Sequence, residues 1–221
     1  MNKFNLTTAV FFSMFASSAF AGGASPFYLG ATIGSGHVDN GASQMDNYGF
    51  CEKAHADNED CRIGDGGSVG HIYGGFQISE SLAIEAGYAD LGNTASYYYT
   101  DPIDVSQETT GITVAGVLRH RVSQTSPLHV YGKAGAMRWT TETHSRIDYP
   151  GTAKDSGVSA LVGAGLEYEL NHNVSLKAGW DRYYDVGESA HLVEIHDHGH
   201  DINTLETDVD VYSAGVNVSF F

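Results

Sequence analysis

The densest cluster of groups that could do chemistry lies between residues 187 and 206. It alternates imidazoles with carboxylates, at His191, Glu194, His196, Asp197, His198, His200 and Asp201. Such groups suit Zn²⁺, Cu²⁺ or Ni²⁺, and histidines two positions apart lie on one side of an extended segment. We therefore treat His196, His198 and His200 as candidate metal ligands. The alternative is a solvated polar loop, because a metal site also needs neighbouring groups that hold its ligands in place.

The N-terminal residues bear on the state of the two cysteines. A basic start, an apolar stretch from Leu6 to Phe15 and the sequence Ala19-Phe20-Ala21 follow the order of a secretory signal, which predicts a signal peptide over residues 1–21 and a mature domain over residues 22–221. Export beyond the reducing cytosol makes a disulfide the expected state of Cys51 and Cys61. In the chain-entropy model this bridge stabilises the fold by about 2–3 kcal/mol. No activating base can be assigned to either thiol, so a catalytic cysteine is not expected.

A third group of charges stands inside segments that are apolar at every second position. Its members are Glu85, Arg119, Arg121, Lys133, Glu167, Lys177 and Asp181, of which Glu85, Arg119, Lys133, Glu167 and Lys177 are the candidate ion-pair residues. Because successive side chains of a strand point to opposite faces, these charges lie opposite the apolar face, as in the polar lumen of a membrane barrel. The candidate residues would form ion pairs across that lumen. Two roles stay open: the pairs neutralise one another, or they exchange partners and admit water or ions.

The elements that would position these charges are eight segments with a strand period. They cover residues 27–34, 71–78, 82–89, 112–118, 128–136, 158–168, 174–180 and 212–220. Short links at 79–81, 122–127 and 171–173 alternate with long links at 35–67, 92–107, 144–155 and 187–206. The period alone also fits a soluble sandwich. The alternation of link lengths favours an all-β fold, an eight-stranded antiparallel up-and-down transmembrane β-barrel with periplasmic turns and extracellular loops.

Aromatic side chains near the ends of these segments fit the rings that line a membrane interface. They are Tyr88, Trp139, Tyr168, Trp180 and Phe220. Trp139 shares its parity with the lumen charges, so packing inside the barrel is the alternative for this residue. The formal net charge of −16 argues against nucleic acid as a partner and favours divalent cations or basic macromolecules.

Several stretches resemble the transmembrane domain of the OmpA family. They are Phe27-Tyr28-Leu29-Gly30-Ala31, Tyr73-Gly74-Gly75-Phe76-Gln77, Glu85-Ala86-Gly87-Tyr88, Val130-Tyr131-Gly132-Lys133 and Gly165-Leu166-Glu167-Tyr168, in an order that covers almost all of residues 26–221. The resemblance implies that Glu85, Glu167, Lys177 and Lys133 occupy positions where the family pairs carboxylates with basic groups, and Arg119 lies two residues from the matching basic position. The residues from Ser213 to Phe220 are similar to the C-terminal signal that the barrel assembly machinery recognises. The chain ends without the family's periplasmic peptidoglycan-binding domain, so we expect no anchoring to the cell wall.

These observations predict a non-enzymatic protein of the bacterial outer membrane. No Ser/His/carboxylate set is identifiable, and no cofactor is expected. The expected role is structural, with acidic extracellular loops that contact a host or surface macromolecule while the barrel contacts outer-membrane lipids. The alternative is a minor ion channel that the lumen ion pairs gate.

Overall fold

The computed structural model describes residues 26–39, 62–64, 66–98, 104–145, 151–187 and 207–220. All elements in this part of the chain are strands, and none of it forms a helix long and apolar enough to span a membrane. The strands are β1 (Phe27–Asp39), β2 (Arg62–Gly64), β3 (Ser68–Gln77), β4 (Leu82–Tyr98), β5 (Asp104–Arg121), β6 (Leu128–Ser145), β7 (Gly151–Glu169), β8 (Val174–Val186) and β9 (Thr207–Ser219).

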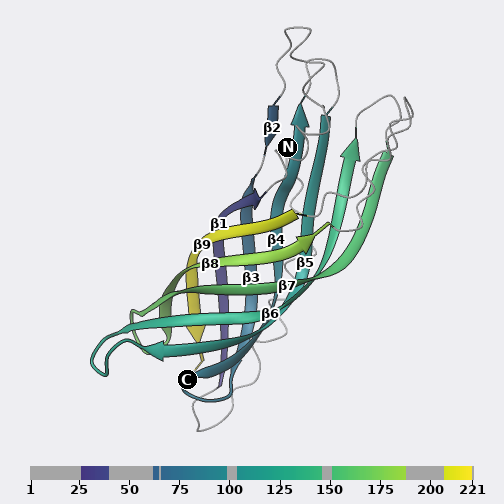
Figure 1. Ribbon diagram of the computed structural model, residues 1–221. Helices are drawn as coiled ribbons and strands as arrows, with labels where there is room; N and C mark the ends of the chain where they lie inside the picture. Colours follow the sequence, from purple (N-terminus) through teal and green to yellow (C-terminus); the bar gives the residue numbers. More distant parts are fainter. Residues whose placement is uncertain are drawn as a thin grey trace.

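The strands form one closed antiparallel sheet. Their order is β2-β4-β3-β1-β9-β8-β7-β6-β5, and β5 pairs back onto β4. The short strand β2 and strand β3 pair with successive sections of β4 and share one position in the ring, so the barrel has eight strand positions. Figure 1 shows β1 and β9, the first and last strands, side by side where the ring closes. The predicted eight-stranded antiparallel barrel is confirmed.

The strand register fixes the tilt of the barrel. A line of paired residues that starts at Phe27 crosses every strand in turn and returns to β1 at His37, ten residues further along the strand. This offset means that the strands run obliquely to the barrel axis. An eight-stranded barrel of this kind has an interior just wide enough to be filled by side chains. The lumen is therefore a packed core.

The apolar face of each strand points outward, as the alternation predicts for a lipid-facing barrel. Side chains such as Ile33, Ile84 and Leu118 are 77%, 47% and 62% exposed, whereas Glu85 and Lys177 on the opposite face are 3% and 4% exposed. A soluble protein of this size would bury its large apolar side chains. Here their exposure matches a surface solvated by lipid.

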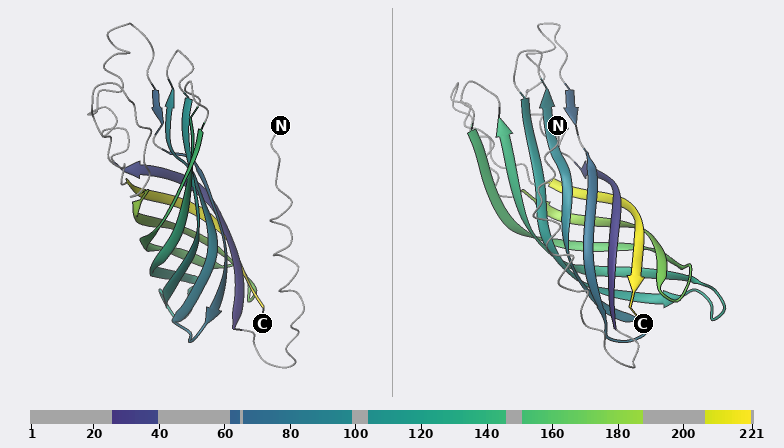
Figure 2. Two further views of the ribbon diagram at one scale, coloured as in Figure 1. Left: turned by 90° about the vertical axis from the view of Figure 1, so that its right-hand side faces the viewer. Right: turned by 180° about the vertical axis from the view of Figure 1, so that it is seen from behind.

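The strands extend further than the sequence pattern predicts. Residues 92–107 and 144–155 were expected to be long loops, but β4 continues to Tyr98, β5 begins at Asp104, β6 continues to Ser145 and β7 begins at Gly151. These extensions are rich in Thr, Ser and Tyr and lack an apolar face, so a search for alternation misses them. In Figures 1 and 2 the ends of β4, β5, β6 and β7 rise beyond the ends of β1, β8 and β9.

A β-bulge marks the point where β4 leaves the regular barrel. The register with β5 shifts between Asp90 and Asn93, and Gly92 adopts a positive φ of 66°. The Gly92 N–H donates to the Asp90 Oδ1 at 2.9 Å. Glycine is favoured at Gly92 because a side chain is strained in this conformation.

Candidate functional site

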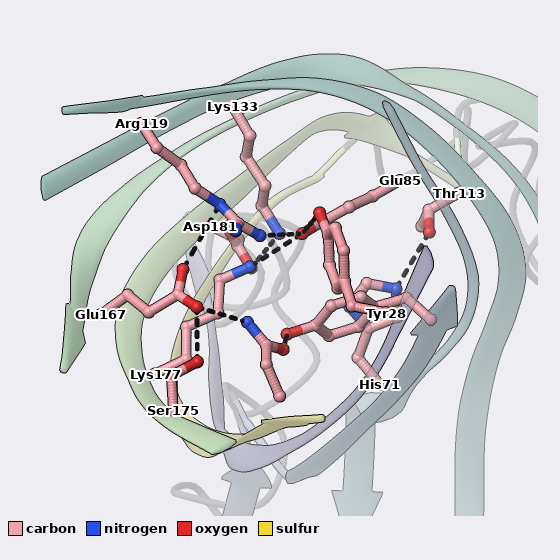
Figure 3. Close-up of polar contacts among 12 residues, drawn as sticks. Tyr28, His71, Glu85, Thr113, Arg119, Lys133, Glu167, Ser175, Lys177 and Asp181 are labelled. Atoms are coloured by element: carbon pink, nitrogen blue, oxygen red, sulfur yellow. Dashed lines mark hydrogen bonds and ion pairs between the residues drawn. The ribbon is translucent and has the colours of Figure 1, made fainter. Parts of the chain in front are cut away.

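A carboxylate at the centre of the lumen collects contacts from three other strands. Glu85 on β4 accepts hydrogen bonds through its Oε1 from the Tyr28 hydroxyl at 2.8 Å and the Lys177 Nζ at 3.1 Å. The Arg119 Nη2 lies 3.9 Å from the same oxygen. Figure 3 shows these side chains converging inside the ring of strands. Because a buried carboxylate needs both a counter-charge and hydrogen bonds, this arrangement satisfies Glu85.

A second carboxylate, Glu167 on β7, connects to the first through Arg119. Its Oε1 accepts hydrogen bonds from the Ser175 hydroxyl at 2.5 Å and from the Asn217 Nδ2 at 3.1 Å. The Arg119 Nε is 3.4 Å from the other oxygen. Among the described residues, neither the Arg119 Nε nor its Nη2 has a hydrogen-bond partner. Arg119 therefore lies between two carboxylates without a short bond to either one.

The third ion pair joins two strands that are separated by one strand of the barrel wall. The Lys133 Nζ on β6 donates to the Asp181 Oδ2 on β8 at 2.8 Å. Strand β7 runs between them, and its residue at that level is Gly163, which pairs with both Lys133 and Asp181. A Cβ on Gly163 would overlap the Asp181 Oδ1 and lie 3.0 Å from the Lys133 Cε. The absence of a side chain at Gly163 is what lets this ion pair form.

Tyrosine rings surround the cations of this charged layer. The Lys177 Nζ lies 4.7 Å from the centroid of the Tyr73 ring and 4.4 Å from that of Tyr131, and the Arg119 guanidinium lies 4.6 Å above the Tyr28 ring. Cation–π contacts of this kind stabilise a cation away from water. The Tyr73 hydroxyl also donates to the Asn217 Oδ1 at 2.5 Å, which links Tyr73 to the Glu167 cluster.

We call this set of residues the charged layer. Its members are Tyr28, Tyr73, Glu85, Arg119, Tyr131, Lys133, Gly163, Glu167, Ser175, Lys177, Asp181 and Asn217. It lies toward the end of the barrel where short turns connect β3 to β4, β5 to β6 and β7 to β8. The sequence pattern placed Glu85, Arg119, Lys133, Glu167 and Lys177 on the lumen face, and the structure brings all five together. Reasoning from charge alone missed Tyr28, Tyr73, Ser175 and Asn217. Their lumen parity was readable, but neutral residues give no signal that they bind a carboxylate.

The lumen toward the loop end has a different composition. Along β6 the inward side chains change from Tyr131 and Lys133 to Met137 and Trp139, and along β8 they change from Lys177 and Asp181 to Tyr183. Met137, Trp139, Leu161 and Tyr183 are at most 1% exposed. They form one apolar cluster, the apolar layer, with Val38, Val69, Ala89, Leu91, Ala115, Val186, Val209 and Val211. His71 lies between the two layers, where its Nε2 lies 3.0 Å from the Thr113 hydroxyl.

The structure settles the two alternatives for Trp139. This residue packs inside the barrel against Gly157, where a Cβ would overlap the indole ring, and does not lie at the membrane interface. Tyr88, Tyr168 and Phe220 are about half exposed on the outer face, at 47%, 47% and 48%. Trp180 is partly buried there, and its Nε1 donates to the Asp210 Oδ1 at 2.7 Å.

The remaining predicted sites lie outside the described residues. Cys51 and Cys61 fall between β1 and β2, and His196, His198 and His200 fall between β8 and β9. Within the part of the chain that the structure describes, no group of three or more His, Cys, Asp or Glu side chains could hold a metal ion.

Comparison with known proteins agrees with this architecture. The profile of the OmpA-like transmembrane domain matches residues 23–221. Outer membrane protein A of Salmonella typhi is 26% identical over 223 residues, which cover 100% of this chain and 55% of the relative. Outer membrane protein A of Shigella flexneri is 26% identical over 194 residues, which cover 86% of this chain and 50% of the relative. The chain thus spans about half the length of the curated relatives it matches.

The fold is also found in solved structures. The crystal structure of Neisserial surface protein A superposes with a TM-score of 0.55 and 17% identity, and the match covers 90% of this chain and 100% of that one. At this level of identity the likeness concerns the fold alone.

Proposed function

Because the chain belongs to the OmpA-like transmembrane domain family, a structural family of outer-membrane barrels without enzymatic activity, we propose that it is a closed scaffold that displays acidic loops at the cell surface. The short turns face the periplasm and the loop ends of β4, β5, β6 and β7 face outward in this proposal. Lipid surrounds the barrel, as it does for any protein of this family.

The observation that carries the proposal is the filling of the lumen at two levels. The charged layer occupies the turn end with mutually neutralised groups, and the apolar layer occupies the loop end with buried side chains such as Met137, Leu161 and Tyr183. An ion that entered the charged layer would still meet the buried side chains of the apolar layer, where an unpaired charge costs several kcal/mol. This supports a barrel that acts through its surface and not through a pore.

The loops supply the surface for contact. Their sequences between residues 40 and 61 and between residues 188 and 206 are rich in Asp and Glu, and the whole chain carries a net charge of −16. Such a surface attracts basic macromolecules and divalent cations and repels nucleic acid. A host or surface macromolecule with a basic face is therefore the partner that we propose.

Two measurements on the parent protein test this function. In a planar lipid bilayer the refolded barrel should leave the membrane insulating, and in intact cells an added protease should cleave the loops while the barrel strands survive. Steady single-channel currents from the folded protein, or loops that are cleaved only after the cells are opened, would contradict the proposal.

A minor ion channel remains a second candidate, and Arg119 favours it. This guanidinium lies 3.4 Å from Glu167 and 3.9 Å from Glu85, so it can move its contact from one carboxylate to the other. Conduction further requires the apolar layer to open. The double variant Met137→Ser with Leu161→Ser separates the two functions. If ion pairs alone gate the lumen, the variant carries the same current as the parent. If the apolar layer seals the lumen, the variant conducts ions and the parent does not.

A further inference from the structure

The outer face of β5, β6 and β7 carries an unpaired cation at the border of its apolar region. In the strand register Arg138 on β6 stands between Ile112 on β5 and Val158 on β7. Its side chain is exposed on the same outer face as these neighbours, which are 60% and 69% exposed. Among the described residues no carboxylate forms an ion pair with Arg138. The other outward arginine near this level, Arg182, differs because Asp208 and Asp210 neutralise it at 2.7 and 3.2 Å.

Hydroxyl groups adjoin Arg138 on the side toward the loops. The next outward row of the register runs from Asp90 on β4 through Thr110 and Thr140 to Ser156, and Asp90, Thr140 and Ser156 are exposed. The row beyond that contains Glu108, Glu142 and Lys154, and Lys154 forms an ion pair with Glu142. A guanidinium presents five N–H donors in a planar fork, and hydroxyls add further donors. On β6 and β7 the positions directly beside Arg138 therefore offer the guanidinium and two exposed hydroxyls as hydrogen-bond donors, whereas the carboxylates of Asp90, Glu108 and Glu142 lie one or two positions further away in the register.

From Arg138 toward the turns, the outer face of β6 and β7 carries small side chains, and we call this part the smooth face. Outward positions of β6 and β7 toward the turns hold only small side chains over about three rows, at Ala136, Ala134, Gly132, Ala160, Val162 and Ala164. On β3 and β4 the corresponding face holds large exposed side chains, including Ile72, Phe76, Ile84 and Tyr88. The wall formed by β6 and β7 is thus lower than the wall formed by β3 and β4. This shape leaves room for extended chains that lie flat along the strands.

We propose that this surface seats one phosphorylated lipid of the outer leaflet, with its phosphate on Arg138, Thr140 and Ser156 and its acyl chains along the smooth face of β6 and β7. Arginine recognises phosphate through paired N–H donors and is the preferred residue for this contact. Charge complementarity identifies the head group, since the exposed Arg138 guanidinium has no ion-pair partner among the described residues and an anion would supply one. The inference rests on the orientation in the proposed function, which puts the loop end of β6 at the outer leaflet.

Native mass spectrometry of the refolded barrel in detergent tests the site. The probes are a lipid A with two phosphates, the same lipid after phosphate removal, and inorganic phosphate. The variants are Arg138→Gln, which removes the cation, and Ala134→Phe, which fills the smooth face. The control is Arg121→Gln, because Arg121 is exposed at the turn end, where it pairs with Glu169 at 3.2 Å. Heat-modifiable migration on gels shows that each variant is folded before binding is measured.

The parent and Arg121→Gln should bind the phosphorylated lipid alike, and Arg138→Gln should bind it about tenfold more weakly, as expected for the loss of a charge-assisted hydrogen bond. Ala134→Phe should weaken the binding of both lipids without affecting inorganic phosphate. The site is overturned if the parent and Arg138→Gln bind the phosphorylated lipid equally. It is also overturned if inorganic phosphate alone displaces that lipid, because the acyl chains would then contribute nothing to binding. If the lipid site is overturned but the barrel still folds and leaves the bilayer insulating, the proposed role as a closed scaffold still holds.

Discussion

The two layers of the lumen keep one barrel closed with different forces. In the charged layer, the carboxylates depend on specific partners at hydrogen-bond distance, as Glu85 depends on Lys177 and Tyr28. In the apolar layer, Leu161 and Met137 depend on filled volume and need no particular partner. Electrostatic contacts fail when one partner is lost, because the other is left as a buried charge. Packing contacts fail in proportion to the volume removed. The comparison predicts different responses to mutation in the two layers.

The largest expected effect is in the charged layer. Lys177→Met removes the closest cation from Glu85, and the nearest ion-pair partner that stays is Arg119 at 3.9 Å. We expect the free energy of unfolding to fall by about 3–5 kcal/mol, the usual result of breaking a buried ion pair from one side. Urea titration of the barrel in detergent micelles measures this change.

The matched control is the double variant Glu85→Gln with Lys177→Met. Removal of both charges leaves no uncompensated ion, so the double variant should recover most of the stability that the single variant loses. If it is no more stable than Lys177→Met alone, the charges are not what stabilises this layer.

The next effect belongs to the apolar layer. Leu161→Ala should lower the free energy of unfolding by about 2–4 kcal/mol, because it leaves a cavity among side chains that are almost fully buried. Leu118→Ala, on the lipid-facing side at 62% exposure, is the control and should cost clearly less. The loss for Leu161→Ala should not change with salt concentration. A strong dependence on salt would show that the apolar layer also contains an electrostatic contribution.

A smaller effect is expected where a glycine admits an ion pair. Gly163→Ala should lower the free energy of unfolding by about 1–3 kcal/mol, since its Cβ crowds Asp181 and Lys133 and forces them to shift. Gly132→Ala is the control, because the atom nearest to its Cβ is a backbone oxygen at 3.9 Å, an ordinary contact. Equal unfolding midpoints for the two variants would mean that the Lys133–Asp181 pair adjusts freely.

The sequence could predict the fold and the residues that face the lumen. It could not predict that the lumen is divided into a charged layer and an apolar layer. Strand period and link length were sufficient for the barrel, because lipid on one side imposes a strict alternation on residues such as Ile84 and Glu85. The contact between Glu85 and Lys177 depends on the ten-residue offset around the ring, which brings β4 and β8 together across the lumen. Local patterns contain no information about that offset. The parity of Met137 and Leu161 places them on the lumen side, but nothing in the alternation indicates that they gather into an apolar layer separate from the charges.

The smallest expected effect compares one aromatic polar group in each layer. In the charged layer the Tyr73 hydroxyl donates to Asn217, so Tyr73→Phe leaves the Asn217 oxygen without that donor and should cost about 1–3 kcal/mol of unfolding free energy. In the apolar layer the Trp139 Nε1 has no hydrogen-bond partner among the described residues. Trp139→Phe removes a buried N–H that is already unsatisfied, and this gain offsets the small cavity that phenylalanine leaves. The net change should stay within about 1 kcal/mol. Unfolding midpoints of the two variants, measured side by side in the same detergent, decide the matter. If Trp139→Phe destabilises the barrel as much as Tyr73→Phe, the indole N–H has a partner and the apolar layer is not dry at that level.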